Sequence, residues 1–277
     1  MRFVGRISLI VAFSVCCLLA DGLGTSQVQA EGLIWNLPAD GTWVRYEGTY
    51  KQTNFRGEAE GGNVESDWIR HTTIKSVGQE MAEFRGEMQP CRWVEIKTVT
   101  GKPSEDGIDA GPVGTVIYKA LIPESAVAEE GVDAKGIKVD FLPAVKGFRK
   151  VGQGEVEVID SPTLQVYPLS SLLRSFQIWA PDSAGAGQID TRLGGVSATQ
   201  YHGEHVAETA ITRVRTEAEV WRAADIPFGL AKWTVKIVRE SKDSEASREE
   251  FAPQAESRVE MAVQETGNSA VSELQVP

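Results

Sequence analysis

The residues best equipped for chemistry form one short cluster, His202, Glu204 and His205. Histidine and carboxylate side chains together are common zinc ligands, and histidine is the commonest general base in enzymes. On a strand, however, His202 and His205 point to opposite faces, and Gly203 disfavours a helix that would bring them together. The stretch also lacks the His-Glu-x-x-His spacing of zinc peptidases. The sequence therefore predicts no metal site, and a hydrolase that uses His202 and His205 is an alternative.

Other catalytic motifs are missing from the sequence. No Gly-x-Ser-x-Gly elbow occurs, and the glycines at 185 and 187 neither follow a clear strand nor open a clear helix, as a phosphate loop would. Cys91 is the only cysteine after residue 30 and has no histidine near it in the sequence. We therefore expect a protein that is not an enzyme and that holds no cofactor.

Charge and the N-terminal segment indicate the compartment. The chain has a formal net charge of −11 and no lysine or arginine cluster, which argues against binding nucleic acid. Residues 1–30 are typical of a signal peptide, with Arg2 and Arg6 before an apolar stretch at 7–20 and small residues at 28–30. The apolar stretch is shorter than the roughly 20 residues of a membrane span. We expect a periplasmic or secreted protein with no stable membrane span after cleavage.

The mature chain reads mainly as strands. Residues 42–55 alternate with a period of two, so Val44 and Tyr46 share a buried face opposite Trp43 and Arg45. A meander of three strands follows, with a turn at Gly78. The expected strands of that meander and beyond are 68–77, 81–88, 91–100, 115–122, 137–150, 154–160, 199–222 and 230–240.

Two short helices and a tail complete this expectation. Apolar residues at helical spacing predict a helix over 167–179, an extended loop being the alternative, and a short helical stretch follows Pro123; residues 181–198 read as loop. Residues 241–277 are rich in charge and poor in β-branched residues, which predicts a disordered polar tail. The expected fold is mostly β (α+β): one domain over 31–240, with a long antiparallel curved sheet or incomplete barrel packed on one or two short helices.

Three tryptophans have unexpected positions in these strands. Trp43, Trp93 and Trp221 each share strand parity with charged residues, whereas Trp233 shares parity with Val235. Trp233 is therefore expected in the core. The other three rings are either covered by a second layer of structure or line a hollow for an apolar ligand, so we take them as candidate ligand-binding residues.

The hairpin between Trp221 and Trp233 adds a candidate partner surface. It turns at residues 227–229, and Ile226 and Phe228 at its tip could insert into a partner protein. On this reading the protein is an envelope interaction module, which is an alternative to ligand binding.

The predicted signal peptide, the long antiparallel strands and the stretch EVWRAADIPFGLAKWTV resemble the periplasmic carriers and sorting proteins of outer-membrane lipoproteins. That resemblance implies an incomplete curved barrel with helices over its open face and an acyl chain held in the hollow. The chain departs from the pattern in its length, its polar tail and its lack of a clear pair of lid helices. The favoured interpretation is an exported, non-catalytic binding protein whose partner is an apolar small molecule or a lipidated protein.

Overall fold

The computed structural model describes residues 34–57, 61–105, 107–127, 143–160 and 181–276. Within these ranges the chain is mostly β, as predicted, and forms one antiparallel sheet that does not close on itself. The strands are β1 (Trp43–Asn54), β2 (Val64–Phe84), β3 (Glu87–Ser104), β4 (Gly107–Asp109), β5 (Thr115–Pro123), β6 (Lys146–Val151), β7 (Glu157–Val158), β8 (Pro181–Thr191), β9 (Gly194–Glu208), β10 (Thr212–Arg222), β11 (Leu230–Ser241) and β12 (Ala252–Gly267). The helical pieces in the described ranges are single 3₁₀ turns: η2 (Glu124–Ala126), η3 (Pro227–Gly229) and η4 (Arg248–Glu250).

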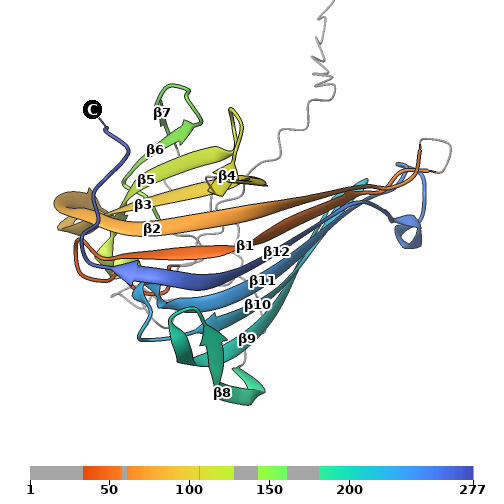
Figure 1. The fold of residues 1–277 in the computed structure, drawn as a ribbon. Coiled ribbons are helices and arrows are strands. Elements are labelled where there is room, and N and C mark those ends of the chain that lie inside the picture. Colours follow the sequence, from red (N-terminus) through yellow and green to blue (C-terminus); the bar gives the residue numbers. More distant parts are fainter. Residues whose placement is uncertain (1–33, 58–60, 106, 128–142, 161–180, 277) are drawn as a thin grey trace, which may run out of the picture.

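The strand order joins two meanders through the last strand. Neighbours follow the order β7-β6-β5-β3-β2-β1-β12-β11-β10-β9-β8, and β4 pairs with β3. The chain builds outwards from β1 to β7 and later inwards from β8 to β11. Strand β12 then lies between β1 and β11 and pairs with both. Figure 1 shows the resulting curved sheet, with β7 and β8 at its opposite ends.

The alternation predicted for the first strand is confirmed. Val44 and Tyr46 of β1 are fully buried, and their neighbours Trp43 and Arg45 are only partly buried. One face of β1 therefore belongs to the core and the other to the outer surface, as period-two patterning requires.

The turn predicted at Gly78 is instead a bulge inside one long strand. Gly78 has a φ of +127°, and the register between β2 and β3 shifts between Ser76 and Gln79. Strand β2 continues to Phe84, and the reversal comes at Arg85 and Gly86, which both have positive φ. A two-residue loop of this kind matches the twist of the paired strands. The predicted meander of three short strands is therefore a hairpin of two long ones.

The middle of the chain also contains more strand than expected. Residues 181–198, predicted as loop, contain β8 and the start of β9, so this prediction is wrong. The strand predicted over 199–222 is divided into β9 and β10 by a turn in which the Thr209 amide donates to the Thr212 carbonyl over 2.8 Å. Strand β8 is at the sheet edge, where glycine-rich sequence is tolerated because only one neighbour has to be paired.

The disordered tail predicted for residues 241–277 is also wrong, because β12 lies in the middle of the sheet. Val259, Met261 and Val263 are buried, whereas Arg258 and Glu260 between them face outwards and are exposed. A strand with one buried face needs apolar residues only at alternate positions, so its average composition is polar. The single domain therefore extends past residue 240, and composition alone concealed the period of two.

Several predictions fall outside the described residues. The signal peptide at 1–30 and the helix at 167–179 are among them, and the stretch after Pro123 is seen only as the turn η2. Among the described residues no helix has the length and apolar composition needed to cross a bilayer.

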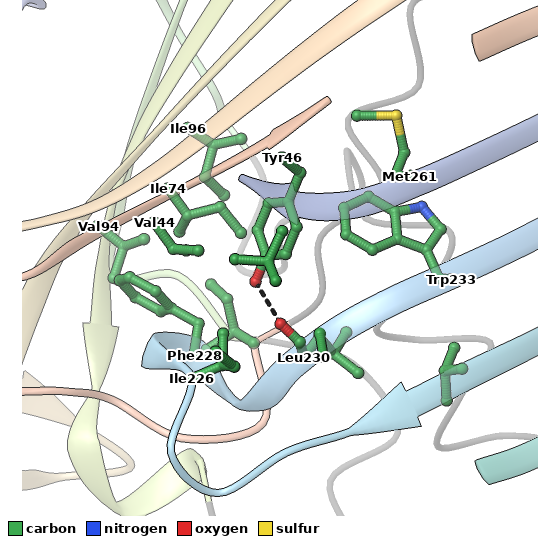
Figure 2. Close-up of a cluster of buried hydrophobic side chains, with 14 of the residues drawn as sticks. Val44, Tyr46, Ile74, Val94, Ile96, Ile226, Phe228, Leu230, Trp233 and Met261 are labelled. Atoms are coloured by element: carbon green, nitrogen blue, oxygen red, sulfur yellow. Dashed lines mark hydrogen bonds between the residues drawn. The ribbon is translucent and has the colours of Figure 1, made fainter. Parts of the chain in front are cut away.

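The core lies on the concave side of the sheet. Side chains from β1, β2, β3, β5, β9, β10, β11 and β12 meet in one buried cluster, so the sheet must curve around them. Figure 2 shows its centre, where the rings of Tyr46 and Trp233 meet edge to face with centroids 4.6 Å apart. The Tyr46 hydroxyl donates to the Leu230 carbonyl over 2.9 Å. Trp233 is fully buried, which confirms the core position expected from its parity.

Candidate functional site on the concave face

One part of the concave face, which we call the concave lining, has two chemically different halves. There, strands β11 and β12 contribute the apolar half, and β1, β2 and β3 contribute the polar half. Nearer η3 the same three strands are apolar, because Val44, Ile74 and Ile96 belong to the core. The lining consists of Trp233, Val235, Val259 and Met261 in the apolar half and Tyr50, Arg70, Thr72, Thr98 and Thr100 in the polar half. Seven of these nine residues are buried, and only Tyr50 and Thr100 are partly exposed.

The register places the two halves in one continuous row. Trp233 lies opposite Met261, Met261 opposite Gly48, Gly48 opposite Arg70, and Arg70 opposite Thr100. Gly48 has to be glycine, because a Cβ atom there would lie 1.8 Å from the Glu260 carbonyl oxygen. The row therefore has no side chain at the boundary between its apolar and polar halves.

Arg70 is the charged residue of the polar half. Only 1% of it is exposed, its Nε donates to Thr100 Oγ1 over 3.0 Å, and its guanidinium carbon lies 4.4 Å from the ring centroid of Tyr50. The hydroxyl oxygens of Thr72 and Thr98 lie 3.4 Å apart in the adjacent row. A guanidinium fixed between a ring and a hydroxyl presents its planar group in one orientation, which suits recognition of a carboxylate or phosphate.

Arg70 was not singled out by the sequence reasoning, although a signal exists. Residues 68, 70, 72 and 74 share one parity on β2, and Ile74 among them is fully buried. The parity test that worked for β1 would therefore have placed Arg70 on the same face as the apolar residue Ile74. Tyr50 and Trp68 lie opposite each other on the same face, with ring centroids 5.5 Å apart.

The three candidate tryptophans lie on the outer face, and the structure does not bring them together around one hollow. Trp43 on β1 and Trp93 on β3 are separated by β2, and Trp221 on β10 is separated from β1 by β11 and β12. Neighbouring strands are about 4.8 Å apart, so β3 and β10 are roughly 24 Å apart along the sheet.

Each of these rings has its own local partners. The Trp43 ring lies against Gly267, where an added Cβ would be 2.5 Å from Nε1. Trp93 donates to Glu80 Oε2 over 3.1 Å and packs against a small second cluster of Ala82, Cys91 and Leu121. Trp221 is partly buried, packs against the edge of the core cluster, and has Lys232 Nζ 4.9 Å from its ring centroid. All three rings are partly buried by neighbouring side chains of the sheet itself.

The predicted partner surface at the hairpin tip is not a surface. Ile226 and Phe228 are 4% and 0% exposed, because the turn folds back into the open end of the sheet. Figure 2 shows the Phe228 ring next to Val44 and Val94. The Trp35 amide donates to the Phe228 carbonyl over 2.9 Å, which fixes the turn. Ile226 and Phe228 therefore close the core and do not form a surface for a partner.

The histidine cluster lies on β9. His202 Nε2 is 3.5 Å from Glu204 Oε1, and its side chain is 45% exposed. His202 lies opposite Glu219 in β10, and His205 lies opposite Thr216, so the two positions have opposite parity. In the described part of the chain, no group of three or more His, Cys, Asp or Glu side chains is arranged to hold a metal ion.

Comparison with known proteins gives no family for the chain. No protein-family model matches it, and no curated protein has significant sequence similarity to it.

Proposed function

We propose that this is an exported, non-catalytic binding protein that holds the acyl chain of a lipid or of a lipidated protein against the concave lining. The observation that carries the proposal is the division of that lining into an apolar half and a polar half that contains Arg70. An amphiphile with an anionic head group has the same division. Export rests on the signal peptide predicted for residues 1–30.

The energetics favour an acyl chain over a small polar ligand. Each methylene group moved from water into an apolar environment contributes about 0.8 kcal/mol. The apolar half contains the large side chains of Trp233 and Met261, which are 0% and 1% exposed, so an acyl chain would take the place of the groups that now cover them. The polar half contains hydroxyl and guanidinium groups, the kinds of side chain that bind an anionic head group and fix its orientation.

A titration with a brominated fatty acid tests this placement, since bromine quenches only nearby tryptophans. We expect quenching of Trp68 and Trp233, which lie on the concave face, and little quenching of Trp221 on the outer face. The variant Trp68→Phe should therefore lose part of the quenching, whereas Trp221→Phe should retain it. Quenching lost only in Trp221→Phe would place the ligand on the outer face.

Affinity provides a second arm of this experiment. Ile237 on β11 lies four residues after Trp233 and is partly buried on the same concave face. Lys236 beside it points outwards. Ile237→Glu should weaken fatty-acid binding at least about tenfold, since a carboxylate would be buried beside the acyl chain. Lys236→Gln should change the affinity less than about twofold. No lipid in native mass spectra of protein from a lipid-containing host, together with no fatty-acid binding, would contradict the proposal.

A further inference from the structure

The outer face of the sheet carries a buried ionic site that is separate from the concave lining. Lys75, Glu95 and Lys119 lie directly opposite one another on β2, β3 and β5, and Lys97 follows two residues after Glu95. We call these four residues the outer cradle. Glu95 is completely buried and Lys119 is 9% exposed. Burying a carboxylate is costly unless it is paired and hydrogen-bonded, so something must cover and satisfy it.

A short segment of the chain itself covers the outer cradle. After β12, the chain turns back over β2 and β3, as Figure 1 shows, and places residues 272–274 against Glu95. Glu95 Oε2 accepts from Ser272 Oγ over 2.7 Å and from the Leu274 amide over 2.9 Å. The Glu273 amide donates to both Glu95 oxygens over 3.0 Å. A carboxylate that accepts from two consecutive amides binds the main chain of a peptide rather than one side chain.

The cradle also binds the side chains of this segment. Glu273 forms ion pairs with Lys75 and Lys97, at 2.5 and 2.6 Å. Lys119 Nζ donates to Ser272 Oγ over 2.8 Å and to the Leu274 carbonyl over 3.2 Å. The Leu274 side chain is only 2% exposed. The site thus contacts a hydroxyl residue, an acidic residue and an apolar residue in that order.

We propose that the outer cradle is a peptide-binding site that also accepts residues 272–274 of a second copy of this chain. Charge complementarity supports this occupant. The cradle has three lysines and one glutamate, a formal excess of two positive charges, and Glu273 supplies the opposite charge. A second copy offers the same segment and hence the same contacts, so exchange of the segment between copies loses no bond. The linked segment normally wins, because linkage gives it a local concentration in about the millimolar range.

Charge reversal in the full chain tests the exchange. The variants Lys97→Glu and Glu273→Lys each place like charges together within one chain. When the two are mixed, the intact Glu273 of the first chain can pair with the intact cradle of the second, and the reversed residues can pair as well. We expect a one-to-one heterodimer in native mass spectrometry and sedimentation velocity. A single chain that carries both Lys97→Glu and Glu273→Lys should remain monomeric, because the two reversed residues can again pair with each other within that chain.

A matched control uses another ion pair on the outer face. Lys236 and Glu256 are 3.6 Å apart on neighbouring strands within the sheet, and neither belongs to the cradle. Mixing Lys236→Glu with Glu256→Lys should give no dimer. Adding Glu95→Gln to the Glu273→Lys chain should weaken the heterodimer at least about tenfold, since the main-chain acceptor loses its charge.

Two results would overturn the proposal. The first is a mixture that stays monomeric although both variants retain the circular dichroism spectrum of the unmodified chain. The second comes from hydrogen exchange in the unmodified chain. If the Glu273 and Leu274 amides exchange as slowly as those around Trp233, the segment leaves only on global unfolding and no second copy can take its place.

Discussion

Phe228 combines complete burial with a left-handed backbone. Its φ is +63°, a region that is uncommon for a large side chain, and the turn that holds it contributes hydrogen bonds to the residues around it. The side chain closes one end of the concave core, next to Val44 and Val94. Such strain persists only where surrounding contacts compensate for it.

Substitution of Phe228 should therefore affect stability. Phe228→Ala is expected to lower the free energy of unfolding by about 3–5 kcal/mol, because it leaves a cavity in a closed core. Urea denaturation followed by circular dichroism measures this loss. Ile211→Ala, at a largely exposed position before β10, is the control and should cost less than about 1 kcal/mol. If Phe228→Ala is as stable as the unmodified chain, Phe228 is not part of the core and the turn lies on the surface.

At the scale of elements, β12 differs most from its sequence-based expectation. Its register connects Val259 with Tyr50 on one side and with Val235 on the other. Both edges of the strand are hydrogen-bonded, so its amides are protected by two neighbours over most of its length. A tail of the same composition would have no such protection.

Hydrogen exchange followed by mass spectrometry checks this placement. Peptides from 252–267 should exchange as slowly as those from β1, because both strands are central in the sheet. The short edge strand β7 is the internal reference and should exchange much faster. Complete exchange of 252–267 within seconds would contradict the central position of β12.

The elements also show what the sequence can predict. In β1 and β11, alternation of apolar and charged residues places Val44, Tyr46 and Trp233 correctly, because one buried face leaves a period of two. The same period of two holds in β12, but the average composition of residues 241–277 does not reveal it. The turn at 227–229 was predicted, but its burial could not be, because that burial depends on the curvature of strands that are distant in the sequence. Parity likewise gives the face of Trp43, but not which face of the sheet is concave, so the sequence could not show that the three candidate tryptophans do not surround one hollow.

At the scale of the whole molecule, charged residues are concentrated on the outer face and are partly buried there. The Arg213 guanidinium beside Glu240 holds the pKa of that carboxyl below its usual range. Burial raises the pKa of Glu273, but hydrogen bonds and ion pairs with Lys75 and Lys97 outweigh it and lower the pKa overall. Both carboxylates are therefore more acidic in the folded chain than in the unfolded chain.

This difference predicts how stability depends on pH. A carboxyl with a lowered pKa stabilises the fold above its unfolded pKa of about 4.3, and the contribution is lost as the pH falls through the folded pKa. The free energy of unfolding should thus decrease on acidification below about pH 4.3. Glu240→Gln should show a shallower decrease, and Glu219→Gln, at an exposed position on β10, controls for the loss of one charge. An unchanged slope in Glu240→Gln would contradict this account.

The position of β12 also sets a constraint on how the chain is made. A polypeptide that emerges N-terminus first, from a ribosome or through a translocation pore, completes β1 long before its second neighbour in the sheet exists. One edge of β1 and one edge of β11 stay open until residues 252–267 have emerged. Open edges recruit other strands, including those of other nascent chains. Correct assembly therefore depends on keeping these two edges unpaired, or shielded by a chaperone, until synthesis has passed residue 267.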